Sequence, residues 1–352
     1  MGNSILFSND RYTIQQYNEI PDDAIHFLES IAWGSEGTLY QHKNTAAHFR
    51  SVKDPLLFVL RENGRVQATT LISPRIIHLA HKRITGYYFR YFAIAPALRG
   101  SGIMPRFSRL ILENLKQNAK GKAVFYSYVE KNNRSSYRVT EMAGLKHMAE
   151  FITIGFSRFS PSWSKMIQQI KYGEERTEVL ELLKSVYNKH SFTHFNPIFL
   201  NDNYYVLRDH SEILAGCQYH RVHWTVAQIP GLKGKIIMKL APNLPLINRL
   251  FNPKRFEFLA LEGIFFKKGQ ENALKKLVGG LLAKEKLHSA LTWMGSTCPH
   301  KTSILRKGGL GLFHSFVKNS TGYVMMTSVN LDEDELRFLS SAPVYVSAFD
   351  NI

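Results

Sequence analysis

The amino-acid sequence predicts an α/β fold in which strands and helices alternate and one order of elements occurs twice. An aromatic run of alternating character, residues 87–92, turns through a glycine-containing loop into a helical pattern at residues 106–118. A comparable succession of strand and helix patterns follows residue 164. The length of 352 residues is sufficient for two domains of ordinary size.

In the first half, hydrophobic periodicity and turn residues define the elements in order. Residues 22–32 have apolar side chains at helical spacing after a Pro-Asp-Asp start, which predicts a helix. Asn63-Gly64 separates two apolar runs, and this dipeptide is typical of a two-residue hairpin turn. The expected strands are 11–17, 55–61, 65–78, 87–92, 123–129 and 145–159, and the further expected helices are 45–52 and 106–118.

The second half repeats much of this order. Residues 160–164, Ser-Pro-Ser-Trp-Ser, have the composition of a linker, so we divide the chain into domains 1–160 and 161–352. The Gly144-Leu145 junction has a counterpart at Gly309-Leu310. The expected strands are 204–208, 213–229, 256–266, 290–295, 310–317 and 323–329, and the expected helices are 175–188, 270–286 and 300–307.

Composition indicates a globular protein and gives no sign of disulfides. Apolar residues make up 44% of the chain and aromatic residues 12%, enough for a substantial core. Cys217 and Cys298 cannot form a disulfide framework, which fits a reducing compartment. No signal-peptide pattern or membrane-spanning run is present, so we expect a cytoplasmic protein.

The net charge of +17 predicts attraction to an acidic partner. No acidic residue occurs between residues 213 and 256, and residues 232–256 mix basic with large apolar side chains. This composition suits a peripheral contact with an anionic membrane, or a long loop whose lysines reach to water. Prolines at 242, 245 and 253 break any long helix there. Because no recognition motif accompanies the charge, we expect no specific nucleic-acid binding.

The loop after the aromatic strand has the features of an anion site. Residues 94–105 read Ile-Ala-Pro-Ala-Leu-Arg-Gly-Ser-Gly-Ile-Met-Pro. Gly100 and Gly102 lack a Cβ, so the backbone can bend and approach a ligand closely. Pro105 suits the first turn of a helix. Unpaired N–H groups at a helix start, the helix dipole and the charge of Arg99 all favour a bound pyrophosphate.

This loop resembles motif A of the GNAT acetyltransferase superfamily, which reads Gln/Arg-x-x-Gly-x-Gly/Ala and holds the pyrophosphate of acetyl-CoA. Arg99 and Gly102 match the motif, whereas Met104 stands where the family has Gly or Ala, so its side chain could crowd the last donor. The resemblance implies that the end of the preceding strand binds the pantetheine amides through its backbone.

Residues 133–145 resemble motif B of the same superfamily, a short helix that runs from an Asn to a Gly-Phe at the next strand. Here the segment begins at Asn133 and ends at Gly144-Leu145. The two motifs together imply a GNAT fold, a mixed α+β sheet flanked by helices, with acetyl-CoA or another acyl-CoA as co-substrate. The implied CoA-binding residues are Phe92, Ala93, Ile94, Arg99, Gly100, Ser101, Gly102, Ile103, Met104 and Asn133.

Acyl transfer to an amine needs a polarised carbonyl, a deprotonated nucleophile and a proton for the leaving thiolate. Many family members have a catalytic tyrosine where this chain has Thr140, so another group must move the protons. Tyr137 lies one helical turn earlier, and Tyr126 and Tyr128 share a face of the preceding strand. Glu130 ends that strand beside the presumed acceptor cleft, and Glu36 lies in the loop after the first expected helix; either could relay a proton through water. The catalytic candidates are Glu130, Tyr128, Tyr137 and Glu36, each of which also has an ordinary structural interpretation.

A metal site is not expected. Cys217, His220 and His223 lie close together in the sequence, but on a strand His220 points away from the other two.

The sequence thus predicts an enzyme that transfers an acetyl group from acetyl-CoA to a primary amine of a small molecule or an aminolipid. No cysteine lies near the two motifs, which favours direct attack in a ternary complex. A longer-chain acyl donor with a lipid-linked acceptor, and a catalytically weak CoA-binding scaffold, are alternatives. The second copy has Lys267-Lys268-Gly269-Gln270-Glu271 in place of the phosphate loop, and a carboxylate there would repel phosphate. We therefore expect the second copy to bind no CoA.

Overall fold

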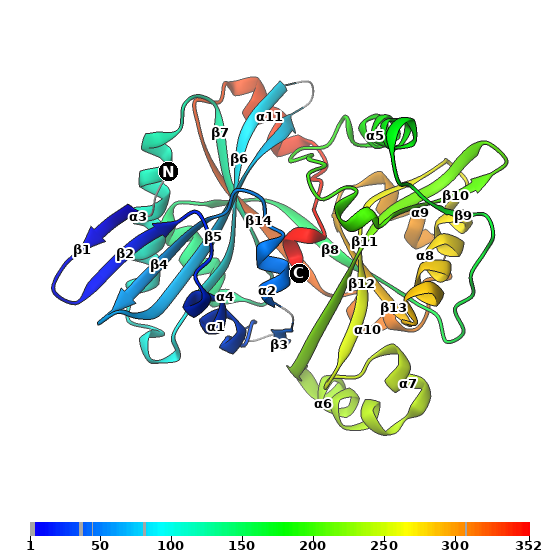
Figure 1. Cartoon of the computed structure of the whole chain (residues 1–352), viewed down its shortest axis with the longest axis horizontal. Helices are drawn as coiled ribbons and strands as arrows, with labels where there is room; N and C mark the ends of the chain where they lie inside the picture. Colours follow the sequence, from blue (N-terminus) through cyan, green and yellow to red (C-terminus); the bar gives the residue numbers. More distant parts are fainter. Residues whose placement is uncertain (1–3, 35–37, 44, 80–81, 307) are drawn as a thin grey trace. The chain divides into compact units, whose positions relative to one another are not determined.

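The computed structural model describes residues 4–34, 38–43, 45–79, 82–306 and 308–352 (Figure 1). The chain forms two compact units, and each contains a mixed sheet with helices packed against it. The first unit is formed by Met1–His78, Lys82–Ala149 and Gly322–Ser340, and the second by Glu150–Thr321 and Ser341–Ile352. The α/β class with a mixed sheet is as the sequence predicts.

The sheet of the first unit has the strand order β1-β2-β4-β5-β6-β7-β14. Strands β6 and β7 are parallel, and the pairs β1/β2, β2/β4, β4/β5 and β7/β14 are antiparallel. The elements are β1 (Ser4–Ser8), β2 (Tyr12–Tyr17), α1 (Asp22–Ser30), β3 (Leu39–His42), α2 (Thr45–Arg50), β4 (Leu56–Glu62), β5 (Arg65–Leu79), β6 (Lys82–Ile94), the 3₁₀ turn η1 (Pro96–Leu98), α3 (Ile103–Asn118), β7 (Ala123–Glu130), α4 (Arg134–Ala143), β14 (Thr321–Val329) and α11 (Glu333–Ser341).

Local sequence explains the elements that frame the site. Asn63 and Gly64 have positive φ values of 49° and 76° and close the β4–β5 hairpin opposite the Glu62↔Arg65 pair, as predicted. Helix α3 buries Phe107 and Ile111 at helical spacing against one face of the sheet. This packing fixes the first turn of α3 at the end of β6.

The C-terminal part of the chain completes the first unit. Strand β14 pairs along the whole of β7, from Gly322↔Glu130 to Val329↔Ala123. On α11, the buried carboxylate of Glu335 accepts hydrogen bonds from Lys122 at 2.8 Å and Lys82 at 2.9 Å. The units therefore differ from the expected division into 1–160 and 161–352. Strands pair through their backbone groups, so the side-chain pattern that predicts a strand at 323–329 does not show which neighbouring strand it pairs with.

The second unit repeats the central motif of the first. Its sheet has the order β8-β13-β12-β11-β10-β9, in which only β12 and β13 are a parallel pair among the described residues. Helix α8 connects them, as α3 connects β6 and β7. The elements are β8 (Lys146–Ser157, which begins in the first unit), β9 (Ile167–Gln169), α5 (Gly173–Tyr187), η2 (Leu200–Asp202), β10 (Tyr204–Asp209), β11 (Glu212–Gln228), α6 (Gly231–Leu240), η3 (Ala241–Asn243), α7 (Pro245–Leu250), β12 (Phe256–Phe266), α8 (Glu271–Glu285), β13 (Ser289–Gly295), α9 (Pro299–Arg306), α10 (Phe313–Val317) and η4 (Phe349–Asn351).

Two segments of the second unit differ from expectation. Residues 310–317 were predicted to be a strand, but Phe313–Val317 forms helix α10. Gly309 and Gly311 have positive φ values, which interrupt an extended chain, and α10 packs so closely on β8 that a Cβ at Gly155 would lie 2.8 Å from Val317. Residues 231–250 form two short helices, α6 and α7. No helix in the described ranges is both long and apolar enough to cross a bilayer.

Candidate active site

The loop before α3 presents backbone N–H groups to solvent. Gly100 and Gly102 have φ values of 78° and 75°, a region that residues with a Cβ rarely adopt. A Cβ built on either glycine would meet no atom within 4 Å, so the space beside the loop is open. Within the described part of the chain, the N–H groups of Gly100, Gly102 and Met104 donate to no protein acceptor. They can therefore bind an anion at the positive end of the α3 dipole.

Side chains near the loop leave these donors accessible. Met104 is buried in the core with Phe107, so the expectation that its side chain crowds the last donor is wrong. Ser101 Oγ donates to the Leu98 carbonyl at 2.6 Å and accepts from the Ile103 N–H at 3.4 Å, which holds the turn. Arg99 is exposed beside it.

The two parallel strands of the first unit, β6 and β7, both continue toward their carboxyl ends past the last residue pair that joins them. Among the described residues, pairing of β6 with β7 ends at Phe89↔Ser127. Beyond that point Tyr91 has a φ of 53°, which is a bulge within β6. As a result, Arg90 and Tyr91 lie on the same face, where Arg90 Nη2 donates to the Tyr91 hydroxyl at 2.7 Å. The following Phe92 returns to the opposite face and stacks near Phe89.

The bulge leaves the end of β6 available for an extended ligand. The Ala95 N–H donates to the Gln67 carbonyl of β5 at 2.7 Å. Because backbone groups alternate sides along a strand, the N–H and C=O of Ile94 point away from β5, to the side that β7 has left. This is where the resemblance expects the pantetheine amides. Phe92 and Ile94 pack their side chains on the α3 core, which fixes the strand end.

Glu130 lies at the carboxyl end of β7, on the face that carries Arg90 and Tyr91. Its carboxylate accepts a hydrogen bond from the Tyr40 hydroxyl. Burial raises the pKa of Glu130 to about 7, and the hydrogen bond from Tyr40 opposes that rise. Burial, together with the nearby carboxylate, raises the pKa of Tyr40 well above its usual value. A carboxyl group that titrates near neutrality is suited to act as a general base.

An aromatic cluster surrounds this pair. The Tyr91 ring lies 5.5 Å from Trp33 and 6.3 Å from His42, measured between ring centroids. Burial and the neighbouring Arg90 lower the pKa of His42 to about 3, so at neutral pH His42 is uncharged and a weak base. Glu130 is therefore the better base of the two. Tyr40, Tyr91, His42 and Arg90 are not among the site residues predicted from the sequence. The one usable signal was the arginine among the aromatic residues of the expected strand 87–92, which points to Arg90 but not to the residues that meet it.

The structure brings some of the predicted catalytic residues together and separates others. Tyr128 shares the face of Glu130 and contacts Tyr88 at 5.0 Å between ring centroids. Tyr137 instead contacts Tyr323 of β14, with ring centroids 5.5 Å apart. Glu36 lies outside the described residues.

Motif B forms a helix whose polar residues have structural roles. Asn133 caps α4, accepting a hydrogen bond from the Ser136 N–H at 3.0 Å. Thr140 is buried and donates to the carbonyls of Ser136 and Tyr137. Gly144, with a φ of 107°, ends the helix. The cap fixes the direction in which the chain leaves Glu130.

The corresponding loop of the second unit has a different character. Gly269 has a φ of 84°, like the glycines of the first loop. However, Glu271 is buried in the first turn of α8, and its Oε2 has no hydrogen-bond partner among the described residues. An acidic group at this position opposes phosphate binding.

Two of the residues weighed as metal ligands have other surroundings in this unit. Cys217 packs in the core under α8, whereas His220 lies beside Glu262.

Comparisons with known proteins agree on the fold. No model of a known protein family matches the sequence, and no curated protein matches it. Among solved structures, Saccharomyces cerevisiae N-myristoyltransferase with bound myristoyl-CoA is similar, with a TM-score of 0.56 and 11% identity, over 92% of this chain and 84% of that chain. A GCN5-related N-acetyltransferase from Sphaerobacter thermophilus has a TM-score of 0.51 and 11% identity, over 92% and 97% of the two chains. One from Anabaena variabilis has a TM-score of 0.51 and 10% identity, over 89% and 72%.

Similarity to both kinds of protein extends over most of the chain and so includes both units. The open loop before α3, the bulge in β6 and the separation of β6 from β7 are the parts of the structure that match the resemblance found in the motifs. This chain has the fold of the GNAT superfamily.

Proposed function

We propose that the first unit transfers an acyl group from a CoA thioester to a primary amine. One observation carries the proposal. An open anion-binding loop and a carboxyl group with a pKa of about 7 lie at the carboxyl ends of the same parallel strand pair, β6 and β7. The loop provides a place for the diphosphate, and Glu130 provides a place for the proton that the amine must lose.

The residues suit a direct reaction. The N–H groups of Gly100, Gly102 and Met104 bind the diphosphate, and the exposed edge at Ile94 orients the pantetheine chain. Glu130 accepts a proton from the attacking amine, either directly or through one water molecule. A C–N bond then forms as the C–S bond breaks, and the thiolate leaves with a proton. Tyr128 is the candidate donor of that proton, because it lies on the Glu130 face of β7.

The proposal is tested by measuring release of free thiol from acetyl-CoA and from palmitoyl-CoA in the presence of a panel of primary amines. Turnover with acetyl-CoA supports acetyl transfer, and turnover with palmitoyl-CoA alone supports a longer-chain donor. Tight CoA binding without turnover on any amine would contradict the proposal and favour a CoA-binding scaffold.

A further inference from the structure

Helices α6 and α7 of the second unit carry an exposed apolar face. Leu232, Ile236 and Leu240 recur every four residues and therefore share one side of α6. Their exposed fractions are 75%, 47% and 45%, and Leu244 and Leu246, at the start of α7, are exposed to 42% and 59%. We call these five side chains the α6–α7 face. Five exposed large apolar side chains within fifteen residues are more than the scattered single residues of an ordinary surface, and they indicate an interaction surface.

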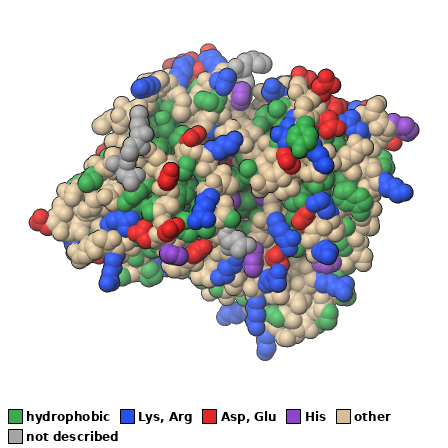
Figure 2. Space-filling view, viewed as in Figure 1, with side chains coloured by type: hydrophobic (Ala, Val, Ile, Leu, Met, Phe, Trp, Pro, Cys, Tyr) green, Lys and Arg blue, Asp and Glu red, His purple; other side chains and the backbone are tan. Residues whose placement is uncertain are grey.

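Cations border this face. Lys235 and Lys239 lie between its leucines on α6 and are exposed, and Arg249 lies three residues after Leu246 on α7. Within the described ranges these three cations have no ion-pair partner, and no acidic residue occurs from residue 213 to residue 256. Figure 2 shows basic and hydrophobic side chains together at the lower edge, where Figure 1 places α6.

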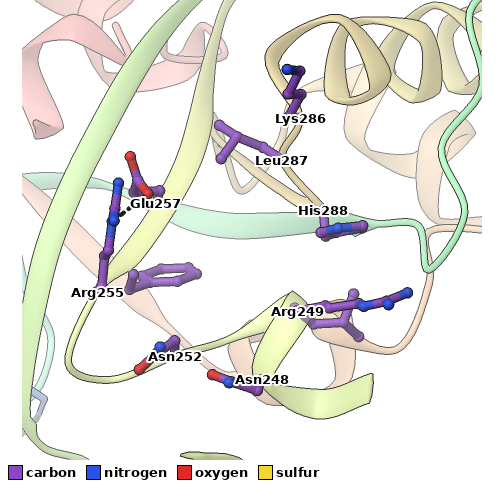
Figure 3. Close-up of a pocket in the computed structure, with 10 residues that line it drawn as sticks. Asn248, Arg249, Asn252, Arg255, Glu257, Lys286, Leu287 and His288 are labelled. Carbon is purple, nitrogen blue, oxygen red and sulfur yellow. Dashed lines mark hydrogen bonds and ion pairs between the residues drawn. The ribbon is translucent and has the colours of Figure 1, made fainter. Parts of the chain in front are cut away.

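A pocket of about 310 Å³ lies beside α7, between that helix and the start of β12 and β13 (Figure 3). Arg249, Arg255, Lys286 and His288 line it, together with Asn248 and Asn252. Its one carboxylate, Glu257, is already shared by Arg255 at 2.8 Å and Arg221 at 3.1 Å. The pocket therefore has an excess of positive charge and two amide groups, a combination suited to a phosphate.

We propose that the second unit docks on an anionic phospholipid bilayer through the α6–α7 face, and that the pocket beside α7 receives a lipid phosphate. A short helix with leucines on one side and lysines at their margin lies in the plane of a membrane interface. The leucines enter the acyl boundary while the lysines contact headgroups. The net charge of +17 draws the whole chain to the same surface.

Two features favour a bilayer over a protein partner. The five apolar side chains lie on or beside two short helices and, within the described ranges, do not line the pocket beside α7, so that pocket is not an apolar groove of the kind that binds a peptide. The charge is also of one sign throughout the segment, which disfavours pairing with a second copy of this chain.

The test is flotation of the full chain with vesicles of phosphatidylcholine alone or mixed with phosphatidylglycerol, at low and high salt. We expect binding only to the anionic vesicles, and loss of that binding at high salt. The double variant Lys235→Gln/Lys239→Gln is expected to lower the apparent affinity by about tenfold or more. Lys184→Gln/Lys189→Gln, which removes two exposed lysines at the end of α5 in the same unit, is the charge-matched control and should change little.

Apolar and pocket variants separate the parts of the proposal. Ile236→Ser/Leu240→Ser should abolish flotation, whereas Met142→Ser/Leu336→Ser, at two exposed apolar positions of the first unit, should not. Arg249→Gln/Lys286→Gln should weaken binding more than the α5 control does, and equal binding would overturn the phosphate pocket.

Absence of flotation at low salt would overturn the docking surface. So would a change of oligomeric state caused by Ile236→Ser/Leu240→Ser, because it would identify the face as an interface between copies. None of these measurements uses CoA, so they are independent of the proposed transfer reaction.

Discussion

At the scale of single residues, the proposed transfer reaction depends on the environment of Glu130. A solvated glutamate has a pKa near 4.5, whereas burial raises the pKa of Glu130 to about 7. The group is therefore close to half ionised at neutral pH, which allows it both to accept and to release a proton. The same burial leaves His42 neutral and Tyr40 protonated, so neither competes as a base.

Glu130→Gln is expected to reduce kcat/KM for acyl transfer by about 10²–10⁴-fold, because the amide cannot accept the proton. In the unaltered protein, kcat/KM should rise with pH through a midpoint near 7 as the carboxyl group ionises, and the variant should lack that step. The control is Glu141→Gln, an exposed glutamate of α4. A profile that keeps its midpoint in Glu130→Gln would show that another group is the base.

Tyr40→Phe provides a second test of the same carboxyl group. The hydroxyl of Tyr40 donates to the Glu130 carboxylate and so holds its pKa down. Removing that hydrogen bond should raise the pKa of Glu130 and move the midpoint of the pH–rate profile to higher pH, with the plateau at high pH less affected. A midpoint that moves to lower pH, or does not move, contradicts the assigned contact.

At the scale of elements, the β6–α3–β7 segment combines a positive φ at two glycines with a helix start. Gly102→Asp is expected to abolish CoA binding, because it strains a residue with a φ of 75° and places a carboxylate among the anion donors. Open space around the site means that the chain should still fold.

The matched control for this variant is Gly269→Asp in the second unit. Gly269 has a φ of 84°, is equally open, and lies in the corresponding loop before α8. The variant Gly269→Asp should therefore introduce the same backbone strain as Gly102→Asp but leave the affinity for CoA unchanged in isothermal titration. If Gly269→Asp also removed CoA binding, the second copy would be a functional CoA site.

Sequence patterns predicted the elements whose cause is local. The Asn63-Gly64 hairpin, the glycine loop before α3 and the short helix after Asn133 each depend on a few neighbouring residues, and each forms where expected. Within the expected strand 310–317, Phe313–Val317 is a helix, because positive φ values at Gly309 and Gly311 interrupt the extended chain before it. Tyr40, Tyr91 and His42 were missed because the fold brings β3 and β6 to the end of β7 that carries Glu130, and no local pattern records that meeting.

At the scale of the whole molecule, the two halves of the sequence are not the two halves of the structure. Strand β14 follows the second copy in the sequence but forms part of the first unit, where it covers β7 from Ala123 to Glu130. The strand that carries the candidate base is therefore held by a segment about two hundred residues further along the chain.

A chain of residues 1–160 is consequently expected to fold poorly. Without β14 it exposes one edge of β7, and it loses the Glu335 carboxylate that pairs with Lys82 and Lys122. Light scattering should detect aggregation, and thermal unfolding should lose cooperativity. A soluble, cooperatively unfolding fragment with the CoA affinity of the full chain would show that the first 160 residues form an independent domain.

The measurement that tests the account most directly is a parallel titration of the full chain with CoA and with pantetheine, which has the thiol arm but no diphosphate. If the N–H groups of Gly100, Gly102 and Met104 hold the diphosphate, CoA will bind and pantetheine will bind far more weakly. Gly102→Asp will then reduce the affinity for CoA to that for pantetheine. Equal binding of the two molecules, or CoA binding that Gly102→Asp leaves intact, would contradict the role assigned to the loop before α3.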